Sequence, residues 1–284
     1  MTTSVATSAS PHESGTTAHR WVATLDDART SQVHWVLRLG GAACFIGHGA
    51  FGIITKAAWV PYFGVVGIPS EVAYTLMPVV GTVDIAMGIA VLISPRPFVL
   101  LYMVVWALWT AMLRPFAGET AFETLERAGN YGVPLALLLL VGRPASWRGW
   151  IRAGDRIPSS PATVARVLAW TTALLLFGHG ALAAITAKPL FAAHYAALGM
   201  PASVAPITGY AEMIVALVML VVPHPALLVA IAIWKLATEA LFPIAGSPVW
   251  EFIERGGSYA APLALALMSV RRAAPHSDVR GRSP

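Results

Sequence analysis

Long apolar runs, separated by short polar or proline-bearing connections, dominate this chain. Runs close to membrane-spanning length lie at 36–56, 72–94, 97–113, 129–142, 164–186, 202–222, 225–242 and 254–270. A straight transmembrane helix needs about 20 predominantly apolar residues, and shorter or proline-bearing runs tilt or kink. The pattern therefore predicts an all-α integral membrane bundle of about eight transmembrane helices.

The composition supports a lipid environment, because 57% of the 284 residues are hydrophobic and only 12% are charged. A soluble globular domain typically carries about 25% charged residues. The formal net charge is +5, and most arginines lie in one connection and the C-terminal tail: Arg143, Arg148, Arg152, Arg156, Arg166, Arg271, Arg272, Arg280 and Arg282. Basic connections stay on the cytoplasmic side, so this charge is a topology signal and predicts no nucleic-acid partner. We expect a multi-pass protein of a bacterial-type cytoplasmic (inner) membrane, with both termini cytoplasmic and the lipid bilayer as its main partner.

An internal repeat divides the chain. The segment Gly47-His48-Gly49 returns as Gly178-His179-Gly180, and Pro78 through Asp84 returns as Pro206 through Glu212. The predicted organisation is a flexible cytoplasmic tail (1–34), a four-helix repeat (35–143), a basic cytoplasmic linker (144–163), a second four-helix repeat (164–272) and a basic tail (273–284). Because each unit has an even number of spans, the two repeats should be parallel and related by an axis along the membrane normal.

Two histidines and two acids recur at similar predicted depth. Asp84 and Glu212 lie near mid-membrane, where a carboxylate needs a partner, a hydrated cavity or protonation. His48 and His179 are the natural partners, and such pairs could relay protons, orient a ligand or hold helices together. Alternatively, His48 and His179 could be two axial ligands of one haem or metal ion.

A second recurring set lies toward the outer side of the membrane. Its members are Glu123, Arg127 and Tyr131 with Trp106, and Glu251, Arg255 and Tyr259 with Trp234. Each Glu–Arg pair is four residues apart, so it can form a salt bridge along one helix face. If the arginines instead point inward with the aromatic residues, they form a cationic, aromatic-walled mouth suited to an anionic or quinone-like ligand.

One difference between the repeats stands out. Lys235 and Glu239 occupy positions where the first repeat has Ala107 and Ala111. Charged residues inside a membrane helix face partners or a cavity and commonly mark functional sites. We therefore rank Glu212, Lys235 and Glu239 highest among the candidate ligand-binding or proton-relay residues.

The order Gly-His-Gly, Lys, Gly-x-Pro and a helix with glycine and an acid resembles the DoxX-like superfamily of four-helix membrane proteins. The matching residues are Lys56, Gly67, Pro69, Gly81, Asp84 and Gly88, then Lys188, Gly199, Pro201, Gly209 and Glu212. The resemblance covers both helical cores, although two fused units depart from the usual pattern. It implies a subunit associated with redox metabolism, with other membrane or redox subunits as partners. Our preferred hypothesis is that this subunit binds a quinone, lipid or other small hydrophobic ligand in an outer-half polar cavity.

Three alternatives stay open. They are a bis-histidine haem or metal electron-transfer protein, a small-solute transporter that uses the charged second repeat, and a structural accessory subunit of a membrane complex. Walker loops, dinucleotide fingerprints, nucleophile elbows and His-Glu-x-x-His zinc helices are missing from the sequence, which disfavours the enzyme classes that carry them.

Overall fold

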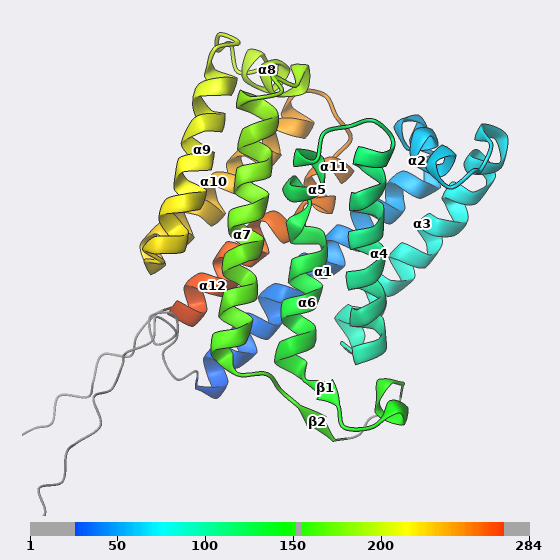
Figure 1. The fold of residues 1–284 in the computed structure, drawn as a ribbon, viewed down its shortest axis with the longest axis vertical. Coiled ribbons are helices and arrows are strands. Elements are labelled where there is room, and N and C mark those ends of the chain that lie inside the picture. The colour runs from blue at the N-terminus through cyan, green and yellow to red at the C-terminus, as the bar shows by residue number, and fades with distance from the viewer. Residues whose placement is uncertain (1–25, 152–154, 270–284) are drawn as a thin grey trace, which may run out of the picture.

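A computed structural model describes residues 26–151 and 155–269, and helices dominate these ranges (Figure 1). The helices are α1 (Asp27–Ile53), α2 (Val60–Val65), α3 (Ser70–Ile93), α4 (Pro97–Phe116), α5 (Phe122–Glu126), α6 (Ala128–Val141), α7 (Pro161–Ala184), α8 (Pro189–Ala196), α9 (Val204–Val221), α10 (Pro225–Ile244), α11 (Trp250–Glu254) and α12 (Gly256–Ser269). Short 3-10 turns lie at Ala57–Trp59 and Trp147–Trp150, and two short strands, β1 (Arg143–Pro144) and β2 (Arg156–Ile157), form an antiparallel hairpin.

Six of the described helices are long and apolar enough to cross a membrane: α1, α3, α4, α7, α9 and α10. The helical class and the multi-pass character agree with the sequence prediction. The two remaining predicted spans appear as α6 and α12, which have 14 residues each and are too short to cross alone. Each follows a five-residue helix, α5 or α11, from which it is separated at Arg127 or Arg255.

The first helix begins earlier than the predicted first repeat, which started at residue 35. Asp26 caps α1, because its side chain accepts a hydrogen bond from the backbone N–H of Arg29 at 2.9 Å. Residues 27–34, which the sequence assigned to a flexible tail, are therefore helical. The rest of that tail, up to residue 25, and the predicted tail at 273–284 lie outside the described residues.

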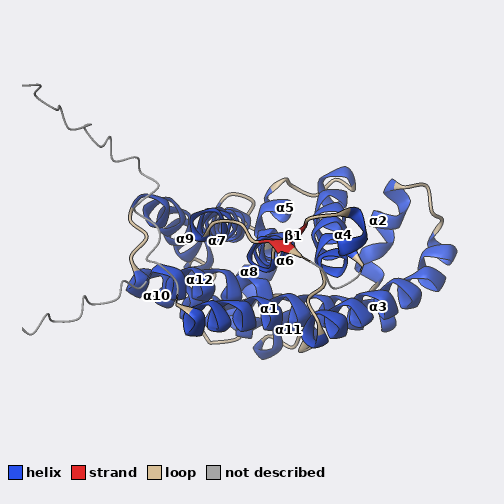
Figure 2. Cartoon of the chain, turned by 90° about the horizontal axis from the view of Figure 1, so that it is seen from below, coloured by secondary structure: helices blue, strands red, loops and turns tan. Residues whose placement is uncertain are grey.

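The long helices form two rows, which Figure 2 shows from below. In one row α9 packs on α7, α7 on α6 and α6 on α4; in the other, α3 packs on α1, α1 on α12 and α12 on α10. The central helices α1, α6, α7 and α12 connect the rows. We refer to α1–α6 as the first half and to α7–α12 as the second half.

Glycine permits the closest helix crossings in the centre. A Cβ atom on Gly47 of α1 would lie 2.4 Å from the backbone nitrogen of Glu254, and one on Gly178 of α7 would lie 2.3 Å from that of Glu126. No side chain fits at those distances, so glycine lets α11 rest on α1 and α5 rest on α7. The glycine before each histidine therefore brings the other half's acidic turn against the histidine helix, whereas Gly49 and Gly180, which follow the histidines, contact α3 and α9 of their own halves.

The helices have two distinct ends. The β1–β2 hairpin lies at one end, and α2 and α8 lie at the opposite end (Figure 1). We call these the hairpin end and the cap end. At the hairpin end, Arg96 in the α3–α4 connection donates a hydrogen bond to the carbonyl oxygen of Ile151 at 2.8 Å.

Candidate functional site

Each predicted histidine–acid pair is present in the structure. His48 Nδ1 lies 2.8 Å from Asp84 Oδ2, which connects α1 to α3. His179 Nδ1 lies 2.5 Å from Glu212 Oε2, which connects α7 to α9. The side chain of His48 is 24% exposed and that of His179 only 8%, so the first pair is the more accessible one.

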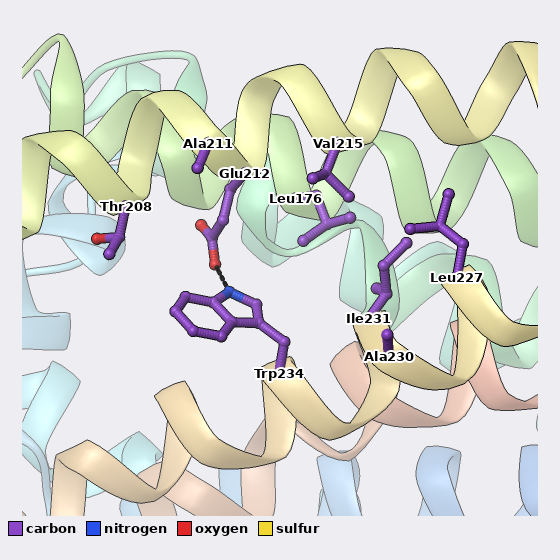
Figure 3. A pocket seen from close by; sticks show the side chains of 9 residues that line it. All are labelled: Leu176, Thr208, Ala211, Glu212, Val215, Leu227, Ala230, Ile231 and Trp234. Carbon is purple, nitrogen blue, oxygen red and sulfur yellow. Dashed lines mark hydrogen bonds between the residues drawn. The ribbon is translucent and has the colours of Figure 1, made fainter.

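The aromatic partner of each acid differs between the halves. Trp234 Nε1 donates a hydrogen bond to Glu212 Oε1 at 2.6 Å (Figure 3). At the corresponding place in the first half, Trp106 Nε1 and Asp84 Oδ1 are both buried and have no hydrogen-bond partner in the described part of the chain. Glu212 is thus bonded on both oxygens, whereas Asp84 is bonded on one.

Lys235 and Glu239 form a buried ionic chain, as their spacing predicted. Lys235 Nζ lies 2.8 Å from Glu239 Oε1 and 4.0 Å from Glu212 Oε1, and Arg255 Nε lies 2.9 Å from Glu239 Oε2. Within the described ranges, Lys235 Nζ, both Glu239 oxygens and Arg255 Nε lack an aligned hydrogen bond. The contacts are therefore ion pairs held by proximity, and they link the α11–α12 junction to the His179 pair.

Ion pairs also connect the two halves reciprocally at the cap end. Lys56 Nζ of the first half lies 2.5 Å from Glu251 Oε1 of the second half, and Lys188 of the second half pairs with Glu123 of the first. Glu251 also pairs with Arg255 of its own half, so its carboxylate lies between one cation from each half. Both lysines stood out in the sequence, but their partners lie far away along the chain and were not predicted.

The predicted Glu–Arg pairs along the helices are present as well. Arg127 Nη1 lies 2.9 Å from Glu123 Oε2, and Arg255 Nη1 lies 2.7 Å from Glu251 Oε2. Arg255 Nε also lies 3.6 Å from Glu126 Oε1 of the other half. These arginines therefore serve both as local salt bridges and as contacts between halves.

A cavity of about 250 Å³ lies in the first half, between α3 and α4 and under α2. We call it the first-half cavity. Trp59, Tyr62 and Trp109 contribute aromatic walls, while polar atoms come from many elements: His48, Thr110, Arg114, Arg127, Asn130 and Glu254. His48 also stacks on Trp59, with ring centroids 4.4 Å apart, so the imidazole has a fixed orientation at the cavity wall.

A larger hollow of about 610 Å³ lies at the cap end between the halves, and we call it the vestibule. It shares Trp59, Tyr62, Arg114 and Arg127 with the first-half cavity. The Tyr62 hydroxyl donates to Glu119 and accepts a hydrogen bond from Arg114 Nη1 at 2.8 Å. Burial raises the pKa of Tyr62 to about 12, so the phenol stays protonated between the two hollows.

The second half has a different hollow. A groove of about 320 Å³ lies between α9 and α10, with aliphatic side chains along most of its length (Figure 3). The Glu212–Trp234 hydrogen bond supplies its main polar feature, with the Trp234 indole crossing the gap between the helices. Neither Lys235 nor Glu239 lines the groove, the vestibule or the first-half cavity.

The other predicted residues have separate roles. Tyr131 and Tyr259 donate hydrogen bonds to backbone oxygens of Thr124 and Phe252, at 3.2 and 2.6 Å, and line none of these three hollows. Tyr62, Arg114 and Asn130 line the cavity but were not among the sequence candidates. Tyr62 and Arg114 were not selected because most candidates were residues that recur in both repeats. Their counterparts in the second half are His194 and Phe242.

None of the three hollows contains both His48 and His179, as a metal ion or haem shared by the two would require. Each Nδ1 faces a carboxylate of its own half, which leaves Nε2 as the possible ligand atom. Among the described residues, no group of three or more His, Cys, Asp or Glu side chains is arranged to hold a metal ion.

No protein-family model, curated protein or solved structure matches this chain.

Proposed function

We propose that this chain is a DoxX-like membrane subunit associated with redox metabolism, and that its first-half cavity binds a quinone or a similar small hydrophobic ligand. One observation carries the proposal: an aromatic-walled cavity with a few convergent polar groups is lined by the half-buried His48, which pairs with the buried Asp84. Binding sites for small molecules are mostly apolar hollows with a few well-placed polar groups. The DoxX-like resemblance and the redox context rest on the sequence.

The cavity suits an amphiphile that enters from the bilayer. Val79 and Trp109 line it and are 59% and 45% exposed, on helices that face lipid in a membrane-inserted bundle. A ring inserted between α3 and α4 would contact the Trp59 and Trp106 side chains, and its carbonyl oxygens could accept hydrogen bonds from donors such as Asn130. A hydrocarbon tail would remain between the helices or in the bilayer.

The proposed membrane arrangement has eight spans in two tandem parallel repeats. The fourth span of each half consists of a short and a longer helix, and in the first half these extend together from Phe122 to Val141, which is sufficient length. Recurrence of the His–acid pairs, the Glu–Arg pairs and the tyrosine–backbone bonds supports the repeat. Arginines gather at the hairpin end, so we place that end and both termini in the cytoplasm of a bacterial-type cell, with the cap end outside.

A cavity-filling variant tests ligand binding. Val79→Trp places a bulky ring in the first-half cavity, whereas Ile207→Trp changes the corresponding exposed position on α9, which lines no cavity described above. Quenching of tryptophan fluorescence by a decyl-tailed benzoquinone in detergent measures the affinity. We expect Val79→Trp to weaken binding about tenfold or more and Ile207→Trp to leave it unchanged.

The test has clear negative outcomes. If the wild-type protein does not bind the tailed benzoquinone, the quinone proposal is wrong. If both variants bind as the wild type does, the ligand binds elsewhere. Size-exclusion profiles and melting temperatures of both variants check that the bundle is intact.

A further inference from the structure

The two halves differ at one buried hydrogen bond. In the second half, Trp234 Nε1 donates to Glu212 Oε1 at 2.6 Å, while His179 takes the other oxygen. In the first half, the indole N–H of Trp106 and one oxygen of Asp84 are buried without a hydrogen-bond partner within the described ranges. The histidine bond to the acid is present in both halves.

Side-chain length explains the difference. Aspartate is one methylene shorter than glutamate, so a carboxylate that reaches both a histidine and a tryptophan in the second half reaches only the histidine in the first. A buried donor and a buried acceptor left unpaired are unfavourable, and native proteins rarely leave them so. The first half thus has one unpaired donor and one unpaired acceptor on the two residues that correspond to the bonded pair of the second half.

We propose that a hydroxyl group of the ligand occupies this place, accepting a hydrogen bond from Trp106 Nε1 and donating one to Asp84 Oδ1. The inference rests on the proposed function and specifies its ligand. A hydroxyl has both capacities, whereas a quinone carbonyl can only accept and an ether oxygen can only accept. The site therefore recognises a hydroxyl-bearing amphiphile, such as a tailed hydroquinone, in preference to the oxidised quinone.

The surrounding space agrees with a single small polar group. A recess of about 10 Å³, lined in part by His48, Trp106, Thr110 and Asn130, adjoins the first-half cavity through these four shared residues; Asp84 lines neither hollow and contacts the recess-lining His48. This volume is about the minimum that one water-sized group needs, and too small for a ring. The ring would stay in the larger cavity while its hydroxyl reaches inward.

Two other polar groups near Trp106 Nε1 and Asp84 Oδ1 already have hydrogen-bond partners. The Thr110 hydroxyl already donates to the carbonyl oxygen of Ala107 at 3.2 Å. The His48 Nδ1 is engaged with the other Asp84 oxygen. A carboxylate acceptor makes the new bond charge-assisted, which is the stronger class of hydrogen bond.

Four probes with the same ten-carbon tail test the inference in detergent by quenching or competition. They are the decyl-tailed hydroquinone kept reduced under argon, the corresponding benzoquinone, the hydroquinone dimethyl ether and 1-decanol. We expect the hydroquinone to bind about tenfold or more tightly than the quinone and the dimethyl ether, as expected for one charge-assisted hydrogen bond. Decanol affinity close to that of the hydroquinone would identify an aliphatic alcohol as an equally suitable ligand, and weaker binding would show that the ring contributes.

Reciprocal substitutions provide matched controls. Asp84→Glu copies the second half, closes the bond to Trp106 and should abolish the preference for the hydroquinone. Trp106→Phe removes the donor and should reduce the preference without any change of charge. Glu212→Asp and Trp234→Phe make the corresponding changes in the second half and should leave the preference unchanged.

The outcomes separate this inference from the proposed function. Equal wild-type affinity for the hydroquinone and its dimethyl ether, or a preference that persists in both Asp84→Glu and Trp106→Phe, would overturn the hydroxyl site while ring binding stands. No binding of any ring probe would overturn the proposed function and this inference together. Should Asp84→Glu fail to fold, the Trp106→Phe comparison alone decides the question.

Discussion

The buried ionic chain of the second half makes a quantitative prediction about stability. Lys235 and Glu239 are 1% and 0% exposed, and their charged atoms lie 2.8 Å apart. Lys235→Met preserves side-chain volume but leaves Glu239 with Arg255 as its remaining cationic partner. Removing one member of a buried ion pair typically costs about 3–5 kcal/mol, and we expect a loss at the lower end because Arg255 remains. Glu239→Gln leaves Lys235 with Glu212 at 4.0 Å and should cost a similar amount.

The double variant Lys235→Met/Glu239→Gln should cost much less than the sum of the single changes. Neither partner is then left charged and unpaired, and Arg255 keeps its contacts with Glu251 and Glu254. The first half has alanine at both corresponding positions and forms its helices without such a pair. From the usual range for directly coupled residues, we expect a coupling energy of about 1.5–3 kcal/mol.

A double-mutant cycle in detergent measures this coupling, with unfolding followed by circular dichroism as a denaturing detergent is added. The pair Arg114–Glu119 provides the control cycle, because its atoms lie 3.2 Å apart and the Glu119 side chain is 30% exposed. Pairs of that kind couple by less than about 1 kcal/mol. Additivity within about 0.5 kcal/mol for the Lys235–Glu239 cycle would refute the view that the two charges depend on each other.

Two further predictions concern packing and pH. Gly47→Ala should destabilise the bundle by about 1–3 kcal/mol, because the new Cβ would lie 2.4 Å from the Glu254 nitrogen. Gly64→Ala is the control, because its Cβ would meet nothing within 4 Å. Thermal melting compares the two variants, and equal melting temperatures would contradict this packing. Burial, with a smaller contribution from nearby positive charge, lowers the pKa of His194 to about 4. Between pH 6.5 and 4 the unfolded chain therefore binds a proton at His194 more readily than the folded protein does. The free energy of unfolding is unaffected by this histidine above pH 6.5 and decreases as the pH falls toward 4. His194→Phe should reduce the decline in melting temperature between these values, and an unchanged slope would exclude this histidine as its source.

Local spacing and depth were sufficient to predict several features. Apolar runs indicated the long helices, because a run of about 20 apolar residues is typical of a membrane-spanning helix. The i,i+4 spacing predicted the Glu123–Arg127 and Lys235–Glu239 pairs, since helical geometry alone brings such residues together. The high cost of a carboxylate in lipid predicted that Asp84 and Glu212 would have partners, and the histidines at similar depth supplied them.

Tertiary packing decided where the candidate site lies. The sequence ranked Lys235 and Glu239 highest because charge is rare in membrane helices, yet both are enclosed by ion pairs and face none of the three hollows. The first-half cavity instead arises from how α2, α3 and α4 pack, with Tyr62 and Asn130 brought to it from separate elements. No spacing rule links these segments.

Each half's sequence therefore determined its helices, its local ion pairs and its histidine–acid pair. Only the assembled bundle decided that Lys56 binds Glu251 across the halves, and that the bond between acid and tryptophan closes beside Glu212 and stays open beside Asp84. The physical reason is that helical geometry brings together only residues a few positions apart. The one-methylene difference between Asp84 and Glu212 affects hydrogen bonding only because other helices hold the tryptophan and the histidine in place.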